Sequence, residues 1–184
     1  MSNSEDFGKW WNNEQYGTLW SNKNNAVKDT SDESENTDMW ILDACSTIAS
    51  YRNSYYDNIA EVYKSDYAKN VLLRQVLIMN TANEALKGAQ HNLESLQRFH
   101  NDFRLRLNRV QEDILRMMER WWKLFIQEIE QNKLIASRYI AKLQTGTPYS
   151  LFSQFADRKH GQKICKEENN LLKEIAVAID KYIL

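Results

Sequence analysis

Proline and glycine are scarce in this chain of 184 residues, which contains one proline and five glycines. Average usage would give roughly nine prolines and thirteen glycines at this length. Tight turns between β-strands depend on these two residues, so their scarcity argues against an all-β or an α/β fold. The chain is predicted to be all-α.

Strong net charge, clustered cysteines and long apolar runs are also missing. The formal net charge is −1, so no overall field attracts nucleic acid or an anionic membrane. Cys45 and Cys165 lie far apart and show no zinc-like spacing with the histidines, so no metal and no cofactor are expected. No apolar run approaches the ~18 residues of a membrane span, and the N-terminus lacks signal-peptide features. A cytoplasmic protein is expected.

Residues 1–36 are rich in Ser, Asn, Asp, Glu and Lys and are predicted to form a disordered acidic tail. Residues 1–43 carry nine acids against three lysines, a net charge of −6. The tail nevertheless contains a partner-binding candidate of large apolar side chains: Phe7, Trp10, Trp11, Tyr16, Leu19 and Trp20. The first three fall at i, i+3 and i+4, as on one face of a short helix. They can dock onto their own domain or enter a groove of a partner.

Residues 37–184 are predicted to form one helical bundle domain, with helices at about 38–87, 90–144 and 163–184. Within 38–87, the first amphipathic helix is expected to end between Asp66 and Asn70, and Val71–Leu86 is either a second helix or its prolongation. Along the first helix, apolar residues repeat at spacings of 4 and 3, and Arg52 occupies one position of that stripe. Gly88 can bend the chain or simply be tolerated within a helix. Gly146 followed by Pro148 predicts the end of the long middle helix.

The clearest periodic pattern lies between Phe103 and Leu124, where apolar residues alternate at spacings of 4 and 3. This helix seam consists of Phe103, Leu107, Val110, Ile114, Met117, Trp121 and Leu124. Such spacing is typical of a helix that packs against another helix. A second stripe widens the apolar face from Met118 onward, so bundle core is expected there and an external helix along residues 103–117. The predicted architecture is an elongated antiparallel helical bundle or coiled coil.

Arginines gather along the same segment, and guanidinium groups bind phosphates. Arg104, Arg106 and Arg109 are therefore candidate anion-binding residues. Acids stand among them, and residues three or four apart, such as Asp113 and Arg116, are neighbours on a helix surface. A paired, solvated face is the competing interpretation.

The usual signatures of a catalytic site are missing from the sequence, which has no phosphate-binding loop, no recognisable nucleophile motif and no Glu-x-x-His pair. We therefore expect a non-enzymatic adaptor or scaffold, a subunit of an intracellular complex joined through helix-helix contacts to its own copies or to other proteins. The alternative is a BAR-like membrane-curvature module in trafficking, a dimer that binds an anionic membrane surface. A helical nucleic-acid factor is a third interpretation, which the net charge disfavours.

Overall fold

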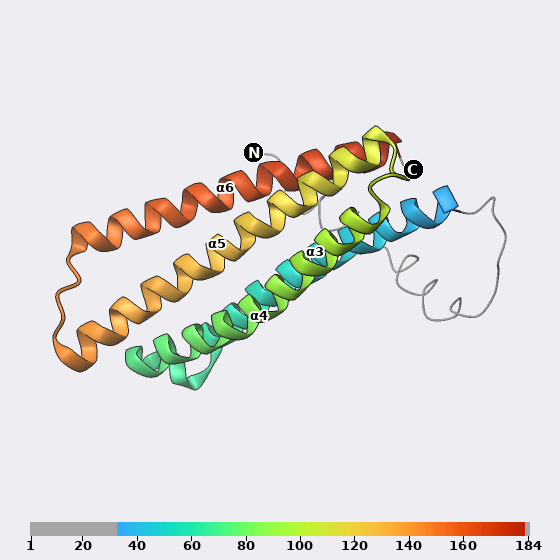
Figure 1. Ribbon diagram of the computed structural model, residues 1–184. Coiled ribbons are helices and arrows are strands. Elements are labelled where there is room, and N and C mark those ends of the chain that lie inside the picture. The colour runs from blue at the N-terminus through green and yellow to red at the C-terminus, as the bar shows by residue number, and fades with distance from the viewer. Residues whose placement is uncertain (1–32, 183–184) are drawn as a thin grey trace. The chain divides into compact units, whose positions relative to one another are not determined.

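A computed structural model describes residues 33–182 of the chain. Its elements are α3 (Glu33–Lys64), the 3-10 helix η1 (Asp66–Lys69), α4 (Val71–Phe103), α5 (Arg109–Thr145) and α6 (Leu151–Tyr182) (Figure 1). The described residues contain no strand. The predicted all-α fold and helical bundle are confirmed. The aromatic cluster between Phe7 and Trp20 lies outside the described residues, and so does most of the predicted tail.

The chain divides into two compact units, Met1–Ala49 and Ser50–Leu184, which are described separately. Within the first unit the structure describes the start of α3, where Ile41, Cys45 and Ile48 are buried at spacings of 4 and 3. The second unit contains the rest of α3 and all later elements. The sites discussed below lie within this second unit.

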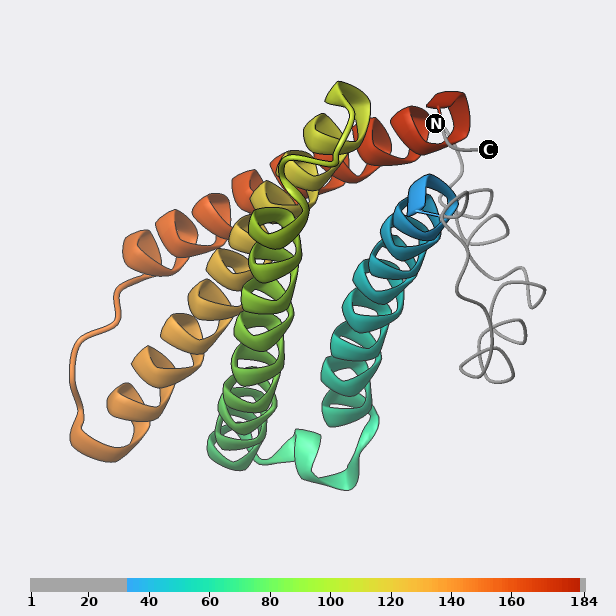
Figure 2. The same cartoon turned by 45° about the vertical axis from the view of Figure 1, so that its right-hand side comes forward.

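In the second unit, α4, α5 and α6 run antiparallel to their neighbours, joined by turns at residues 104–108 and 146–150. Helix α5 packs against both α4 and α6 (Figure 2). A helix with neighbours on two sides needs a broad apolar face. The buried apolar residues of α5 are Ile114, Leu115, Met118, Trp121, Trp122, Phe125, Ile129 and Ala136.

Both ends of α5 are set by short-range chemistry. At its start, Asn108 Oδ1 accepts a hydrogen bond from the Gln111 amide at 2.9 Å, and Gln111 Oε1 accepts one from the Asn108 amide at 3.0 Å. This reciprocal pair is a capping box. At its end, Gly146 adopts a φ of 70°, a left-handed conformation that favours glycine. The end predicted from Gly146 and Pro148 is confirmed.

The first helix begins earlier than predicted, and the stretch 38–87 is divided between two helices, which is the alternative with a second helix from Val71. Helix α3 already begins at Glu33 and ends at Lys64, and α4 begins at Val71. Ser65 Oγ donates to the carbonyl oxygen of Val62 at 2.8 Å, and Asn70 Oδ1 accepts from the Leu73 amide at 3.1 Å. Such side chains compete with helical hydrogen bonds and favour helix ends, so no proline or glycine was needed for this break.

The predicted second and third helices also began at the wrong residues. The helix expected from residue 90 begins at Arg109, because residues 71–103 belong to α4 and Asn108 caps a new helix. The helix expected from residue 163 begins at Leu151, where Ser150 Oγ accepts from the Ser153 amide at 3.1 Å. The polar stretch 157–162 is therefore helical.

Gly88 does not bend α4, which continues through it to Phe103. Instead, it makes room for Tyr51 of α3, whose hydroxyl donates to the carbonyl oxygen of Ala85 at 2.9 Å. A Cβ atom at residue 88 would lie 2.1 Å from that hydroxyl oxygen. The glycine thus permits a close approach of a side chain to the α4 backbone.

Among the described residues, no helix has both the length and the apolar character that crossing a membrane requires.

Candidate functional site

The predicted seam from Phe103 to Leu124 does not lie on one helix. Phe103 is the last residue of α4 and Leu107 lies in the following turn, so only the residues from Val110 onward belong to α5. The prediction of one continuous face along residues 103–117 was wrong, because Asn108 needs an extended backbone to cap α5.

Within α5, the seam residues are covered to different degrees. Ile114 and Trp121 are fully buried, whereas Val110, Met117 and Leu124 are half-buried. The second stripe, which includes Met118 and Trp122, is buried more consistently. This part of the pattern is core of the bundle.

The candidate anion-binding residues Arg104, Arg106 and Arg109 are exposed around the turn between α4 and α5. The Arg106 guanidinium lies 5.9 Å from the ring centre of Phe103. Close by, Nδ1 of His100 lies 2.5 Å from Oε1 of Glu119, which ties α4 to α5. The arginines therefore share one turn and do not follow the length of a helix.

An aromatic layer joins α3 to the middle of α5. We define it as Tyr51, Tyr55, Trp121, Trp122 and Phe125. Trp121 stacks on Phe125 with ring centres 5.0 Å apart. Tyr51 and Tyr55 present their edges to Phe125 at 6.2 and 5.6 Å. Offset and edge-to-face pairs of this kind are the favoured arrangements of aromatic rings, so the layer fixes how α3 lies on α5.

A polar layer lies next to the aromatic layer and is formed by α3, α5 and α6. We define it as Arg52, Tyr56, Glu128, Glu168 and Asn169. Arg52 Nε donates to Glu168 Oε1 at 2.6 Å, and its Nη2 donates to Asn169 Oδ1 at 2.8 Å. The Tyr56 hydroxyl donates to Glu128 Oε1 at 2.5 Å, and the Arg52 guanidinium lies 4.8 Å from the Tyr56 ring centre. Three helices thus meet at one buried network.

The surroundings of Glu168 in the polar layer favour the protonated form of its carboxyl group. Burial, and then the hydrogen bond and charge of Glu128, raise the pKa of Glu168 to about 9, against the opposing effect of Arg52. Oε2 of Glu128 and Oε2 of Glu168 are both buried, and within the described structure neither has a hydrogen-bond partner. A protonated Glu168 reduces the charge that this layer buries, and burial disfavours charge.

The only thiol beside the polar layer among the described residues is that of Cys165, whose Sγ lies 4.0 Å from the Tyr56 hydroxyl. Burial, followed by the charge of Glu128, raises the pKa of Cys165. A thiol becomes a nucleophile when its pKa is lowered, so this environment does not activate it.

The polar layer was missed as a unit, although each charged member leaves a trace in the sequence. Arg52 occupies a stripe position of α3, and Glu168 lies four residues after the buried Ile164 of α6. Glu128 directly precedes the buried Ile129. Charged residues at core positions of several helices indicate that these side chains form ion pairs with one another. The sequence does not show which helices come together.

A groove of about 520 Å³ runs between the second half of α3 and the middle of α4. It is lined by Tyr51, Ser54, Tyr55, Asn58, Asn80, Thr81, Glu84 and Ala85. The α3 residues repeat at i, i+3, i+4 and i+7, so they form one face of that helix. We call this feature the α3–α4 groove.

Across residues 33–182, no group of three or more His, Cys, Asp or Glu side chains could hold a metal ion. Comparison with protein-family models, with curated proteins and with solved structures gave no match to this chain.

Proposed function

We propose that the protein is a non-enzymatic cytoplasmic adaptor, a subunit of a multiprotein assembly that binds a helix of a partner protein in the α3–α4 groove. The observation that carries this proposal is the groove itself. Its α3 side extends from Tyr51 to Asn58, about 10 Å along the axis at 1.5 Å per residue. Two turns of a partner helix match that length, and amphipathic helices commonly bind in grooves of this kind.

The lining of the groove suits a specific contact between helices. Tyr51 and Ala85, which are both half-buried, supply apolar surface, and tyrosine is enriched at protein interfaces. Asn58 and Asn80 add side chains that can both donate and accept hydrogen bonds. An apolar centre with a polar rim is the usual anatomy of a protein interface.

The BAR-like alternative has less support from the arrangement of the arginines. A curved membrane module needs basic residues along the length of its helices, whereas Arg104, Arg106 and Arg109 share one turn. The adaptor also fits the free thiols of Cys45 and Cys165, since disulfides are rare in the reducing cytosol.

Site-specific photocrosslinking in cells tests the adaptor function. A photoreactive amino acid in place of Thr81 in the groove should capture a discrete partner, and the same amino acid in place of Lys123 on α5 should not. The purified partner should then bind the chain directly. Capture of the same proteins from both positions would contradict the proposal.

A matched pair of substitutions locates the contact. Asn58 and Asn170 are both exposed, but only Asn58 lines the groove. Asn58→Trp fills the groove and should weaken partner binding at least about tenfold, as steric exclusion of an interface core does. Asn170→Trp should leave the affinity unchanged. If the partner is a second copy, light scattering will show a dimer that Asn58→Trp dissociates.

A further inference from the structure

The turn between α5 and α6 displays an unusual set of exposed apolar side chains. Leu151 and Phe152 are each 82% exposed, Phe155 is 67% exposed, and Leu143 at the end of α5 is 49% exposed. We call these four residues the α5–α6 tip. Single exposed apolar residues are common on protein surfaces, but three in the first turns of one helix indicate an interaction site.

The inner side of the same turn is well packed, so the tip is not a loosely folded segment. The Tyr149 hydroxyl donates to Asp157 Oδ2 at 2.8 Å, and its ring lies edge-on to Tyr139 at 5.0 Å. The Tyr139 hydroxyl donates to Gln154 Oε1 at 2.7 Å, and Arg138 forms an ion pair with Asp157. These contacts fix α6 on α5 and hold the apolar side chains of the tip outward.

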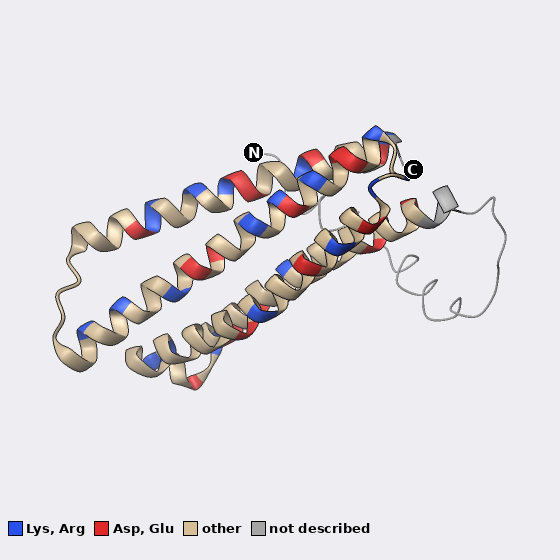
Figure 3. Ribbon diagram, viewed as in Figure 1, with Lys and Arg blue, Asp and Glu red and all other residues tan. Residues whose placement is uncertain are grey.

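The sequence around the tip has a strong positive charge. Residues 131–166 contain seven basic residues and one acid, a net charge of +6: Lys133, Arg138, Lys142, Arg158, Lys159, Lys163 and Lys166 against Asp157. The acid is already engaged by Arg138 and Tyr149. The next acid, Glu167, lies 3.9 Å from Lys163 at an exposed position. Figure 3 shows blue with little red along the end of α5 and the start of α6.

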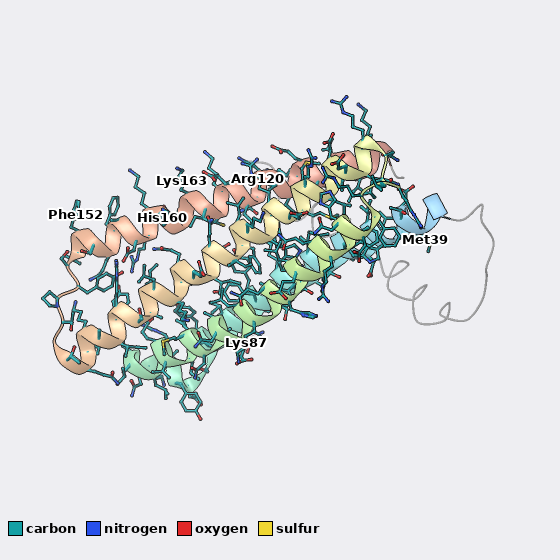
Figure 4. The ribbon with its side chains drawn as sticks, in the orientation of Figure 1. Met39, Lys87, Arg120, Phe152, His160 and Lys163 are labelled. Atoms are coloured by element: carbon teal, nitrogen blue, oxygen red, sulfur yellow. The ribbon has the colours of Figure 1, made fainter. Side chains whose placement is uncertain are left out.

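The rings and the ammonium groups lie on the same side of α6. Phe152, Phe155, Lys159 and Lys163 follow one another at i, i+3, i+7 and i+11, which keeps them on one face of a helix. Figure 4 shows the side chains of Phe152 and Lys163 on the side of α6 away from α5. Lys163 is about 16 Å further along the axis than Phe152 at 1.5 Å per residue.

We propose that the α5–α6 tip is a membrane contact, in which Leu151, Phe152 and Phe155 enter the surface of an anionic bilayer while Lys159 and Lys163 bind the phosphates of its headgroups. Exposed aromatic and aliphatic side chains followed by lysines are the composition of interfacial membrane segments. Long lysine side chains reach the headgroups while their methylene groups lie along apolar surface.

A bilayer fits this surface better than an acidic protein does. Side chains that are 82% exposed protrude from the molecule, so a protein partner would have to provide a matching pocket for each. A fluid bilayer deforms around them. This contact is separate from the α3–α4 groove, so an adaptor would bind its partner with one surface and a membrane with another.

Cosedimentation with vesicles tests the proposal on the full chain. Vesicles of equal parts phosphatidylcholine and phosphatidylserine should bind the protein, and added salt should weaken binding because it screens the lysines. Phosphatidylcholine vesicles should bind it much less. Absence of binding to the anionic vesicles, or equal binding to both, would overturn the proposal.

Two double variants separate the apolar and the charged contributions. Phe152→Ser with Phe155→Ser, and Lys159→Glu with Lys163→Glu, should each weaken binding by roughly tenfold or more, since each lysine near an anionic surface contributes several-fold in affinity. Because all four residues are exposed, both variants should keep the helical circular dichroism and the thermal midpoint of the parent chain.

The other turn of α5 supplies the matched control. Leu105 is fully exposed and lies between Arg104 and Arg106. Leu105→Ser, and Arg104→Glu with Arg106→Glu, should leave vesicle binding unchanged. A loss equal to that of the tip variants would show that net charge alone drives the binding, and the proposal would fail.

A photoreactive phenylalanine analogue in place of Phe152 reports the contact directly. It should crosslink to lipid in the anionic vesicles, and the analogue in place of Leu105 should not. Binding of a soluble polyglutamate peptide with the same dependence on the tip, but without a lipid crosslink, would assign the surface to an acidic protein. Loss of the groove partner in cells would not affect any of these results.

Discussion

The aromatic layer and the polar layer lie next to each other, but different interactions stabilise them: burial of apolar surface in the first, and hydrogen bonds and an ion pair in the second. Tyr51 and Tyr55 of α3 join the first, and their immediate neighbours Arg52 and Tyr56 join the second. Burial of the apolar surface of the aromatic layer stabilises the fold. Other apolar side chains of similar total volume could pack there with little loss of stability. The polar layer requires particular partners on three helices. The first layer gives stability, and the second fixes which residues of α3, α5 and α6 meet.

The largest expected loss of stability follows from a substitution in the aromatic layer. Phe125 is fully buried and contacts both tyrosines of α3. Phe125→Ala removes its apolar surface and leaves a cavity, so the free energy of unfolding should fall by about 4 kcal/mol. Urea denaturation followed by circular dichroism measures it. A loss below about 1 kcal/mol, the range of conservative core changes, would mean that the layer is not packed as described.

Disrupting the polar layer should lower the free energy of unfolding slightly less than Phe125→Ala does. Arg52→Met leaves two buried carboxyl groups without their cation, and unpairing a buried ion typically costs about 3 kcal/mol. The triple variant, which adds Glu128→Leu and Glu168→Leu to Arg52→Met, removes every charge of the layer. It should therefore regain most of the stability that Arg52→Met loses. If the triple variant is less stable than Arg52→Met alone, the contrast between the two layers is wrong.

The next largest effect is a pH dependence of stability, which should come from the polar layer and not from the aromatic layer. The pKa of Glu168 is about 9 in the folded chain against 4.5 for an ordinary glutamate, so between these values the folded chain holds a proton that the unfolded chain has released. The stability that this proton contributes is complete below pH 4.5 and is lost as the pH rises toward 9.

Glu168→Gln replaces the protonated carboxyl by a neutral amide and should flatten this part of the profile. The variant should resemble the parent chain near pH 5 and exceed its stability near pH 9 by about 1–2 kcal/mol. Phe125→Ala should shift the whole profile without changing its slope. Parallel profiles for the parent chain and Glu168→Gln would exclude a raised pKa of Glu168 in the folded chain.

The smallest expected effect concerns the edge of the aromatic layer. Gly88→Ala places a Cβ atom against the Tyr51 hydroxyl and should cost about 1 kcal/mol, even though alanine favours a helix. With Tyr51→Leu already present, the same substitution should stabilise the chain by up to about 1 kcal/mol through its helix propensity. Thermal denaturation of the four proteins measures the coupling. Equal effects in both backgrounds would exclude the steric role of Tyr51.

The sequence predicts the aromatic layer much better than the polar layer. The second stripe of α5 predicts a broad buried face around Trp122 and Phe125, because apolar periodicity follows burial directly. It leaves the break near Ser65 undecided and does not predict the one at Asn108, because side-chain hydrogen bonds to the backbone end a helix there without proline or glycine. Such capping is recognisable only when a helix boundary is already suspected there.

The candidate surfaces were predictable only in part. From the sequence, apolar residues such as Leu151, Phe152 and Phe155 are expected in the core. The structure shows that all three are exposed. The α3–α4 groove depends on which helices become neighbours, and this follows from long-range contacts that no local pattern contains. The aromatic cluster at Phe7–Trp20 and the arginines at Arg104–Arg109 stay predictions as binding sites.

The central claim is that α5 is covered by its own chain, so that contacts with other molecules fall on the α3–α4 groove and the α5–α6 tip. Hydrogen exchange of the purified full chain, at a concentration where light scattering shows a monomer, tests it most directly. The claim predicts the slowest amide exchange in residues 111–136, close to the limit set by global unfolding. Exchange there as fast as in residues 151–156, slowing only when the chain self-associates, would contradict it.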